Sequence, residues 1–403
     1  MNNSKRKIAF IAGLLFNISL LAYFKYTDFL IATANDILST NFTLLHIILP
    51  IGISFYTFQQ IAYLSDIYTK KHVATEQGFL HYGLFISFFP QLIAGPIVHH
   101  KEMMPQFANR ENQQIKWDNI YWGLVLLACG LFKKVLIADN ISPIVAESFD
   151  IRESLTFMEA LFGSLAYTLQ LYFDFSGYSD MAVGIGLFFN IHLPFNFFSP
   201  YKAQNIQDFW RRWHITLSRW LREYLYIPLG GNRSGSGRTL ANLFLTFLVG
   251  GIWHGAAWTF VAWGALHGLA VVVHRLWTKS GRALHVVPAV ILTFLFVNFT
   301  WIFFRAPDFD RVGVFLDAFL GQNGFWLHRD FMRVVNYKGL ITVIVSFIAC
   351  FTLQSSKEFY EKKEPSCYLS IGITSIFLAI LYYLFSLWCF YPEIEPDFIY
   401  FQF

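Results

Sequence analysis

The chain has 403 residues, of which 55% are hydrophobic, 19% aromatic and 14% charged. About a quarter of the residues in a soluble globular domain are charged, so this composition excludes an ordinary water-soluble protein and indicates an integral membrane protein. The formal net charge of +4 is too small to indicate a nucleic-acid-binding protein. We expect an all-α, polytopic membrane protein surrounded by lipids, in which residues 1–403 form a single domain.

Apolar stretches close to the ~20 residues that cross a bilayer recur along the whole chain. The first, residues 8–24, follows a basic cluster and precedes Lys25 and Tyr26, a pair typical of the membrane interface. No small-x-small cleavage site follows it, so we do not interpret it as a cleaved signal peptide. We expect about nine to eleven membrane segments, some not fully spanning. The remaining candidates are residues 44–64, 79–98, 119–138, 157–174, 177–193, 239–253, 255–275, 286–304, 339–354 and 369–391.

Proline and glycine interrupt several of these segments and predict broken or re-entrant helices. The interruptions are Pro50, Pro90, Gly95-Pro96 and Gly177. Non-helical backbone at membrane depth is tolerated only inside protein or beside a water-filled cavity. The chain shows no internal repeat, which disfavours a transporter built from inverted repeats.

The sequence offers no metal-binding pattern. Its four cysteines, Cys129, Cys350, Cys367 and Cys389, are scattered without a CxxC pair, and we expect them to be small apolar side chains. There is also no HExxH motif and no Cys/His cluster. We therefore expect no bound metal and no resident cofactor.

Residues 201–238 form one long polar stretch with an excess of Lys and Arg over Asp and Glu. By the positive-inside rule this stretch is cytoplasmic. Asn205 is a suitable N-cap for a helix that Pro228 and Gly230-Gly231 end. Apolar residues at three- and four-residue steps predict one stripe along it, typical of a helix lying in the membrane interface. The stripe consists of Trp210, Trp213, Leu217, Trp220 and Tyr224.

The arginines of this helix lie largely off the stripe and allow two interpretations. Arg211 and Arg212, together with Arg219 and Arg222, would bind lipid phosphates if the helix is a membrane anchor. They would bind the phosphates of a soluble donor if the helix forms the floor of a cytoplasmic entrance. The pattern leaves both interpretations open.

His254 lies in the stretch GGIWHGAAW (250–258), between two tryptophans and among small residues. Burying an ionisable ring costs free energy unless the ring is satisfied or used. Burial favours the neutral imidazole, which can accept a proton from a hydroxyl and act as a general base. The small neighbours would permit close approach of another backbone or of a narrow substrate. Alternatively, His254 only makes a hydrogen bond between helices.

Other histidines are weaker candidates. His214, in FWRRWHITLSRW (209–220), would orient a base, bind the donor or lie as a ring in the interface. His267, in GALHG, does not share metal-ligand spacing with His254. His99 and His100 lie in a predicted loop, where we expect them to be solvated.

Two carboxylates, Asp174 and Asp180, lie in YFDFSGYSDMAVG (172–184). Acidic residues inside a membrane are functional candidates, but a structural pair with an arginine explains them equally well. The chain has no GxSxG elbow, Walker loop or GxGxxG motif, so it does not indicate an ordinary hydrolase, ATPase or nucleotide-binding protein. An acyl group can in principle pass from donor to acceptor without a covalent enzyme intermediate.

Long motifs in the chain resemble those of the membrane-bound O-acyltransferase family, especially its bacterial branch of alginate O-acetylases and peptidoglycan O-acetyltransferases. The resemblance covers nearly the whole chain from about Leu21, and the terminal FIYFQF (398–403) fits the same branch. Members of that branch usually have further N-terminal membrane segments before the part that matches residues 24–26, and we expect these to be missing here. The motifs are LPIGISFYTFQQIAYLSDIY (49–68), PQLIAGPIV (90–98), YFDFSGYSDMAVGIGLFFN (172–190), PFNFFSPYKAQNIQDFWRRWHITLSRWLREYLYIPLGGNR (194–233) and GIWHGAAWTFVAWGALHG (251–268).

The resemblance implies a ring of tilted helices, with re-entrant segments, around a thinned centre pierced by a tunnel. His254 matches the histidine of the family's WHG motif, taken as catalytic, and His214 matches a supporting histidine. The resemblance implies a protein of the bacterial inner membrane. The implied donor is acetyl-CoA, which would enter the tunnel from the cytoplasm. The acetyl group would reach an exported polysaccharide, alginate, peptidoglycan or similar, through a periplasmic acetyltransferase partner. The candidate substrate-binding residues are Arg211, Arg212, Trp253 and Asp174.

Three alternatives stay open. One is D-alanyl transfer to teichoic acid from a carrier-protein thioester, which the alginate-branch motifs disfavour. Another is a transporter or scaffold that passes intact substrate without acyl transfer and tolerates His254→Gln. The third is an inactive relative with a shortened N-terminus.

Overall fold

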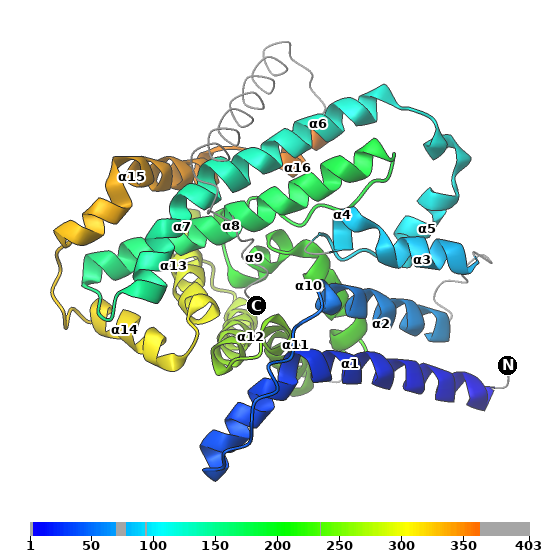
Figure 1. Ribbon diagram of the computed structural model, residues 1–403, viewed down its shortest axis with the longest axis horizontal. Helices are drawn as coiled ribbons and strands as arrows, with labels where there is room; N and C mark the ends of the chain where they lie inside the picture. Colours follow the sequence, from blue (N-terminus) through cyan, green and yellow to red (C-terminus); the bar gives the residue numbers. More distant parts are fainter. Residues whose placement is uncertain (1–2, 70–77, 93–94, 234, 363–403) are drawn as a thin grey trace.

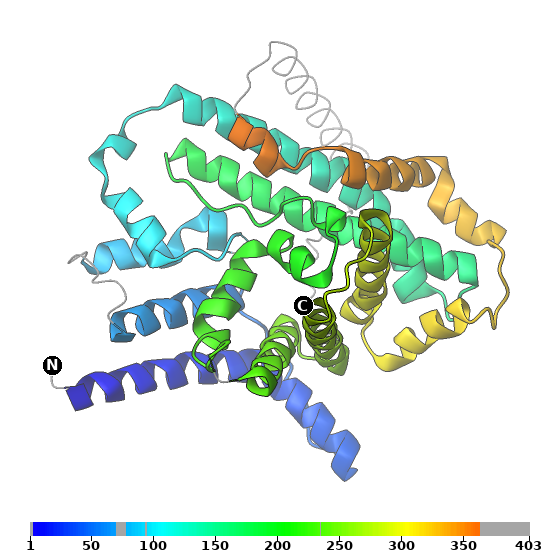
Figure 2. The ribbon, with the colours of Figure 1, turned by 180° about the vertical axis from the view of Figure 1, so that it is seen from behind.

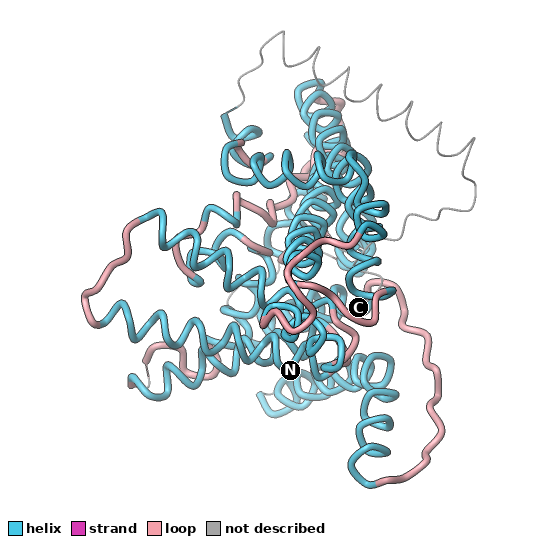
Figure 3. Tube along the Cα trace, turned by 90° about the vertical axis from the view of Figure 1, so that its left-hand side faces the viewer, coloured by secondary structure: helices cyan, strands magenta, loops and turns pink. Residues whose placement is uncertain are grey.

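The computed structural model describes residues 3–69, 78–92, 95–233 and 235–362. These residues form helices joined by loops and turns, with no β-strand among them (Figure 3). The predicted all-α class is therefore confirmed. The predicted segment 369–391, Cys367, Cys389 and the motif FIYFQF lie outside the described residues.

Most of the elements are α-helices, with short 3₁₀ and π-helical turns between some of them (Figure 1). The 3₁₀ turns are η1 (Arg110–Gln113) and η4 (Pro200–Lys202), and the π-helical turns are η2 (Phe132–Ala138), η3 (Glu147–Ile151) and η5 (Arg222–Tyr226). The α-helices are α1 (Asn3–Leu38), α2 (Ile53–Thr69), α3 (Phe79–Ser87), α4 (Phe89–Leu92), α5 (His100–Ala108), α6 (Trp117–Leu131), α7 (Asp139–Ala146), α8 (Phe157–Phe188), α9 (Ile206–Arg212), α10 (Ile215–Leu221), α11 (Ser236–His254), α12 (Trp258–Lys279), α13 (Val286–Arg305), α14 (Phe309–Phe319), α15 (Arg329–Thr352) and α16 (Ser356–Lys362).

Five helical stretches in the described part of the chain are long and apolar enough to cross a membrane. The helices α2, with 17 residues, and α3, with nine, are shorter than the ~20 residues of a full span. These short helices fit the expectation that some segments do not span fully, whereas the total of nine to eleven membrane segments stays a prediction. The five stretches are Asn3–Leu38, Trp117–Ile151, Trp258–Lys279, Val286–Arg305 and Arg329–Thr352.

The proline interruptions break the helices as predicted. The candidate segment 44–64 becomes helical only at Ile53, after Gly52 with φ 75°. The candidate segment 79–98 is split at Phe88 into α3 and the short α4, which contains Pro90. Proline lacks the backbone N–H and clashes with the preceding turn, so it marks a helix boundary here.

Gly177 does not break its helix, contrary to the prediction, because α8 runs without interruption from Phe157 to Phe188. The glycine serves close packing instead. A Cβ at Gly177 would lie 2.7 Å from the carbonyl oxygen of Gly130, and one at Gly184 would lie 2.6 Å from that of Gly123. Two glycine pairs thus let the backbone of α8 approach that of α6, as small residues do between membrane helices.

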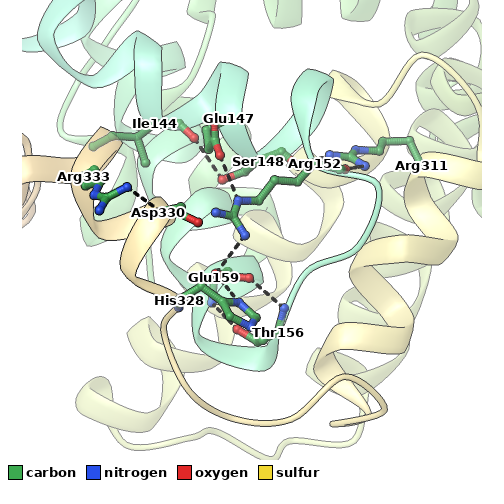
Figure 4. Close-up of polar contacts among 10 residues, drawn as sticks. All are labelled: Ile144, Glu147, Ser148, Arg152, Thr156, Glu159, Arg311, His328, Asp330 and Arg333. Atoms are coloured by element: carbon green, nitrogen blue, oxygen red, sulfur yellow. Dashed lines mark hydrogen bonds and ion pairs between the residues drawn. The ribbon is translucent and has the colours of Figure 1, made fainter.

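A polar network around the buried carboxylate of Glu159 fixes the start of α8 (Figure 4). Thr156 and Glu159 form a capping box, in which each side chain accepts a hydrogen bond from the other residue's backbone N–H. The carboxylate of Glu159 also accepts from Arg152 Nη1 at 3.3 Å, and it lies 3.0 Å from His328 Nδ1. Arg311 of α14 donates to the carbonyls of Ser148 and Arg152. These bonds join η3, α8, α14 and the start of α15.

The basic region contains two helices rather than the one predicted. Helix α9 begins after Asn205, whose side chain accepts from Asp208 N at 2.8 Å, so the predicted N-cap is confirmed. The chain then breaks at Trp213 and His214, and α10 begins at Ile215. Seen from behind, α9 and α10 lie in the middle of the molecule, between α8 and the pair α1 and α2 (Figure 2).

The apolar stripe of this region faces protein rather than a membrane interface, contrary to the prediction. Trp210 and Trp213 pack in one core with Trp301, whereas Leu217 and Trp220 pack in another with Phe58 and Trp253. Because the helix breaks between these two sets, each set can turn towards a different core.

Candidate functional site

His254 is the last residue of α11, and the extended backbone of Gly255 ends the helix there. The ring is buried and surrounded by other aromatic rings. Its centroid lies 5.0 Å from that of Trp253, 5.1 Å from that of Trp263 and 5.0 Å from that of Phe304. The imidazole therefore sits in an apolar environment that favours its neutral form.

His214 lies at the break between α9 and α10, and its ring centroid is 6.5 Å from that of His254. The structure thus brings together the two histidines that the sequence singles out as catalytic. Like His254, His214 is almost completely buried, at 1% exposed, with its ring against that of Phe175 at 4.8 Å. Neither of its ring nitrogens has a hydrogen-bond partner among the residues that the structure describes.

The position of His214 depends on unusual backbone. Its φ of 41° and ψ of 55° are left-handed, a conformation that is uncommon for a residue with a side chain. His214 lies outside the candidate membrane-spanning helices, and burial lowers the pKa of its imidazole to about 3. The ring is therefore neutral at physiological pH.

Asn196 holds this break in place, and the sequence analysis missed it. Its backbone carbonyl accepts from Ile215 N at 3.0 Å, and its side-chain oxygen accepts from the hydroxyl of Thr216 at 2.6 Å. The Thr216 hydroxyl accepts in turn from Ile97 N at 2.9 Å. Asn196 is fully buried, and a polar residue inside the apolar motif PFNFFSP was the signal that could have identified it.

The small residues around His254 serve helix packing. A Cβ at Gly251 would lie 2.4 Å from the carbonyl oxygen of Phe260, and one at Gly255 would lie 2.0 Å from the Phe260 ring. Of the two predicted purposes, close approach of another backbone is therefore the one that α11 and α12 show. A contact of this kind fixes the end of α11 against the start of α12.

The other candidate histidines contact polar groups of the protein itself. His267 Nδ1 accepts from Trp210 Nε1 at 3.2 Å, and its Nε2 lies 3.0 Å from the Thr300 hydroxyl. His99 and His100 are buried, at 0% and 4% exposed, so the prediction that they are solvated was wrong. The prediction was based on their place in a loop, and it could not take into account that residues of α2 and η5 pack against them. His99 Nδ1, for example, lies 3.1 Å from the hydroxyl of Tyr224.

The two predicted acidic residues meet lysines. Asp174, at 1% exposed, is 2.7 Å from Lys134 Nζ, and Asp180 is 2.6 Å from Lys133 Nζ. Both lysines come from η2. This arrangement favours the structural alternative for Asp174, although with lysine rather than arginine, and its predicted substrate contact stays a prediction.

The arginines and Trp253 differ in their surroundings. Arg211 is exposed, whereas Arg212 bonds Asp208 at 2.9 Å and lies over the Phe198 ring. Arg219 makes two hydrogen bonds to Glu102. Trp253 is buried and stacks on Phe58 with centroids 4.8 Å apart, and its substrate contact is likewise still a prediction. Within the described ranges, no group of three or more His, Cys, Asp and Glu is placed to hold a metal ion.

Comparison with known proteins assigns the family. The profile of the membrane-bound O-acyltransferase family matches residues 67–306, a range that includes both His214 and His254. This chain belongs to the membrane-bound O-acyltransferase family. It is a multi-pass membrane protein and an O-acyltransferase.

Individual relatives within the membrane-bound O-acyltransferases cover much of the chain. It is 46% identical over 429 residues to the peptidoglycan O-acetyltransferase of Helicobacter pylori, covering 94% of this chain and 81% of that protein. It is 44% identical over 304 residues to the probable alginate O-acetylase AlgI of Pseudomonas aeruginosa, covering 74% and 57%. It is 28% identical over 279 residues to the teichoic acid D-alanyltransferase of Bacillus subtilis, covering 64% and 69%.

Proposed function

We propose that this O-acyltransferase takes an acetyl group from acetyl-CoA at the cytoplasmic side of the bacterial inner membrane. The acetyl group moves towards hydroxyls of an exported polysaccharide through a periplasmic acetyltransferase partner. The names of the relatives support acetyl as the group and peptidoglycan or alginate as the polymer class. The large excess of basic residues in 201–238 supports a cytoplasmic entry for an anionic donor.

The observation that carries this proposal is the approach of His214 and His254. Ring centroids 6.5 Å apart are too distant for a direct hydrogen bond between the rings. The separation is compatible with one reacting oxygen lying about 3 Å from a nitrogen of each ring, which the proposal requires. The rings of Trp263, Phe304 and Phe175 beside the two imidazoles support the proposal that proton transfer takes place here in an apolar environment.

The reaction can be written with these two residues. His254 accepts the proton of the acceptor hydroxyl as its oxygen attacks the thioester carbonyl. A carbon–oxygen bond forms, the carbon–sulfur bond breaks, and the proton on His254 passes to the departing thiolate. His214, hydrogen-bonded to the same oxygen, keeps the acceptor in line for attack.

Inverted membrane vesicles from a deletion host carrying the wild-type protein test the donor and the reaction class. Radiolabelled acetyl-CoA should give base-labile, ester-linked product, and D-alanyl carrier-protein thioester should give none. The alternative, D-alanyl transfer, is supported by the more distant relative and predicts the reverse. A transporter or scaffold predicts no label from either donor, together with unchanged function of His254→Gln.

A further inference from the structure

The catalytic end of α11 has no cap formed by its own following residues. The last carbonyl groups of an α-helix lack partners within the helix, and they are commonly satisfied by a left-handed residue just beyond it. Here the next residue, Gly255, is extended, with φ −157° and ψ 155°. The carbonyls of Ile252, Trp253 and His254 therefore need partners from elsewhere in the molecule.

Helix α1 supplies these partners. Lys25 Nζ donates to the carbonyl oxygens of Trp253 and His254, both at 2.7 Å, and the Tyr26 hydroxyl donates to that of Ile252 at 2.6 Å. The pair predicted to lie at a membrane interface is thus bonded to the end of the helix that carries His254. Figure 1 shows α1 passing beside α11 and α12.

The same part of α1 also holds the other side of this turn. The ring of Phe29 lies 5.6 Å from that of Trp258, the first residue of α12. Lys25 Nζ is 5.9 Å from the ring centroid of Trp253, which flanks His254. One turn of α1 therefore contacts the chain immediately before and immediately after residues 255–257.

The chemistry of lysine suits this position. Its ammonium group has three donors, so it can bond two carbonyl oxygens at once. The last carbonyl groups of a helix are satisfied when a side-chain N–H donor from a neighbouring element reaches them, and a hydrogen bond is electrostatically stronger in an apolar setting than in water. Removing the side-chain nitrogen would take away the hydrogen bonds that it donates to the carbonyls of Trp253 and His254 and would loosen the last turn of α11.

We propose that Lys25 is a positioning residue for His254, which it holds through the backbone of α11 with help from Tyr26. The expected effect on catalysis rests on the proposed function. The expected effect on the order of the last turn of α11 rests on the hydrogen bonds alone. The hydrogen bonds of Lys25 to this turn go to backbone carbonyls, so it acts on the imidazole through the backbone. It sets where the imidazole of His254 lies relative to that of His214.

The chain offers a matched control on the same helix. Arg6 Nη2 donates to the carbonyl oxygens of Ile67 and Tyr68, at 3.2 and 3.3 Å, near the end of α2. The contact is also from a basic side chain of α1 to the last carbonyls of a neighbouring helix, but that helix end carries no candidate site residue. Arg6→Met therefore removes a similar interaction away from the histidines.

The experiment compares wild type with Lys25→Met, Lys25→Arg, Tyr26→Phe and Arg6→Met. In inverted vesicles, the initial rate of ester formation is measured against acetyl-CoA concentration at equal enzyme amounts. We expect kcat of Lys25→Met to fall about 100-fold, the typical effect of misplacing a catalytic group, with KM nearly unchanged. Lys25→Arg should recover most of that loss, Tyr26→Phe should lose less, and Arg6→Met should match wild type.

Hydrogen–deuterium exchange on the purified proteins in lipid nanodiscs provides a readout independent of catalysis. The peptide 250–257 should exchange about tenfold faster in Lys25→Met than in wild type, and it should be unchanged in Arg6→Met. Unchanged exchange in Lys25→Met would overturn the proposal, whatever the substrate. Faster exchange with unchanged kcat would overturn the positioning role. Faster exchange in a protein whose wild type forms no acetyl ester would instead support the anchoring and overturn the proposed function.

Discussion

Two buried polar regions of this protein are built in opposite ways. Between α8 and η2, Asp174 and Asp180 each meet a lysine ammonium within 2.7 Å. At the junction of α9, α10 and α11, His214 and His254 meet aromatic rings, and the ring nitrogens of His214 have no hydrogen-bond partner among the described residues. The acidic residues of the first region are paired with opposite charges, whereas the second region contains His214, whose ring nitrogens have no such pairing in the described part of the chain.

This difference indicates that the first region stabilises the fold, whereas the second takes part in the reaction. A buried polar group without a hydrogen bond lowers the free energy of unfolding by about 1–3 kcal/mol. Such a group is therefore expected mainly where it serves a function other than stability. The left-handed backbone of His214 adds a further cost in conformational strain. The ion pairs need no further partner, because each charge is already compensated inside the molecule. We therefore expect substitutions in the first region to change stability and those in the second to change catalysis.

The largest stability effect should come from Asp174→Asn. The change removes the carboxylate that Lys134 meets at 2.7 Å and keeps that of Asp139 at 2.8 Å, so the loss should lie at the low end of the about 3–5 kcal/mol that breaking a buried pair typically costs. Thermal unfolding in detergent should show a lower Tm, with kcat of the folded fraction close to wild type. An unchanged Tm with lost activity would instead make Asp174 a substrate-binding residue.

The next effect should be catalytic. Asparagine tolerates the left-handed backbone of position 214, so His214→Asn should fold. Because it loses a ring that orients the reactant, kcat should fall about 10- to 100-fold. The vesicle assay measures this loss, and wild-type kcat in this variant would remove His214 from the reaction.

The same variant sharpens the comparison through pH. The pKa of His214 is about 3 in the folded protein, below the ordinary value of about 6.5. Below about pH 6.5 the unfolded chain therefore binds a proton that the folded chain does not, and stability falls as pH falls. Between about pH 6.5 and 4.5, Tm should drop more in wild type than in His214→Asn. Parallel drops would mean that the ring is not buried as described.

A smaller effect should follow from Gly184→Ala. The added methyl would lie 2.6 Å from the carbonyl oxygen of Gly123 and would push α8 away from α6. Such overpacking typically costs about 1–3 kcal/mol, and Tm in detergent measures it. Gly313→Ala is the control, because a Cβ there has no atom within 4 Å. Equal Tm values for the two variants would contradict the close packing of α6 and α8.

The smallest effect should come from Arg211→Gln. If this exposed arginine attracts the phosphates of the donor, KM for acetyl-CoA should rise about threefold, with kcat unchanged. Arg282→Gln, at an exposed position outside residues 201–238, serves as control. An unchanged KM would support the other interpretation, in which Arg211 contacts lipid phosphates.

Local patterns in the sequence predicted the helical class, the N-cap at Asn205 and the breaks near Pro50 and Pro90, because these depend on neighbouring residues. The prediction for Gly177 was wrong, because a glycine can either interrupt a helix or allow a second helix to approach closely, and the local sequence does not distinguish the two. Local patterns also missed the break at His214. The stripe of Trp210, Trp213 and Leu217 keeps its three- and four-residue steps across that break.

Features that depend on distant parts of the chain could not be read locally. His99 and His100 are buried because residues of α2 and η5, far along the chain, pack against them. The bond from Lys25 to His254 spans 229 positions. The candidate histidines were singled out mainly through family resemblance, and their proximity became visible only in the fold.

The most direct test of the account is ester-linked acetate on the cell wall and exopolysaccharide of a deletion strain. The strain is complemented with wild type, His254→Ala or Arg6→Met, each confirmed at equal level in the membrane. We predict that wild type and Arg6→Met restore acetate on one polymer, whereas His254→Ala leaves it at the deletion level. Wild-type acetate in the His254→Ala strain would contradict a catalytic role for the histidine at the end of α11.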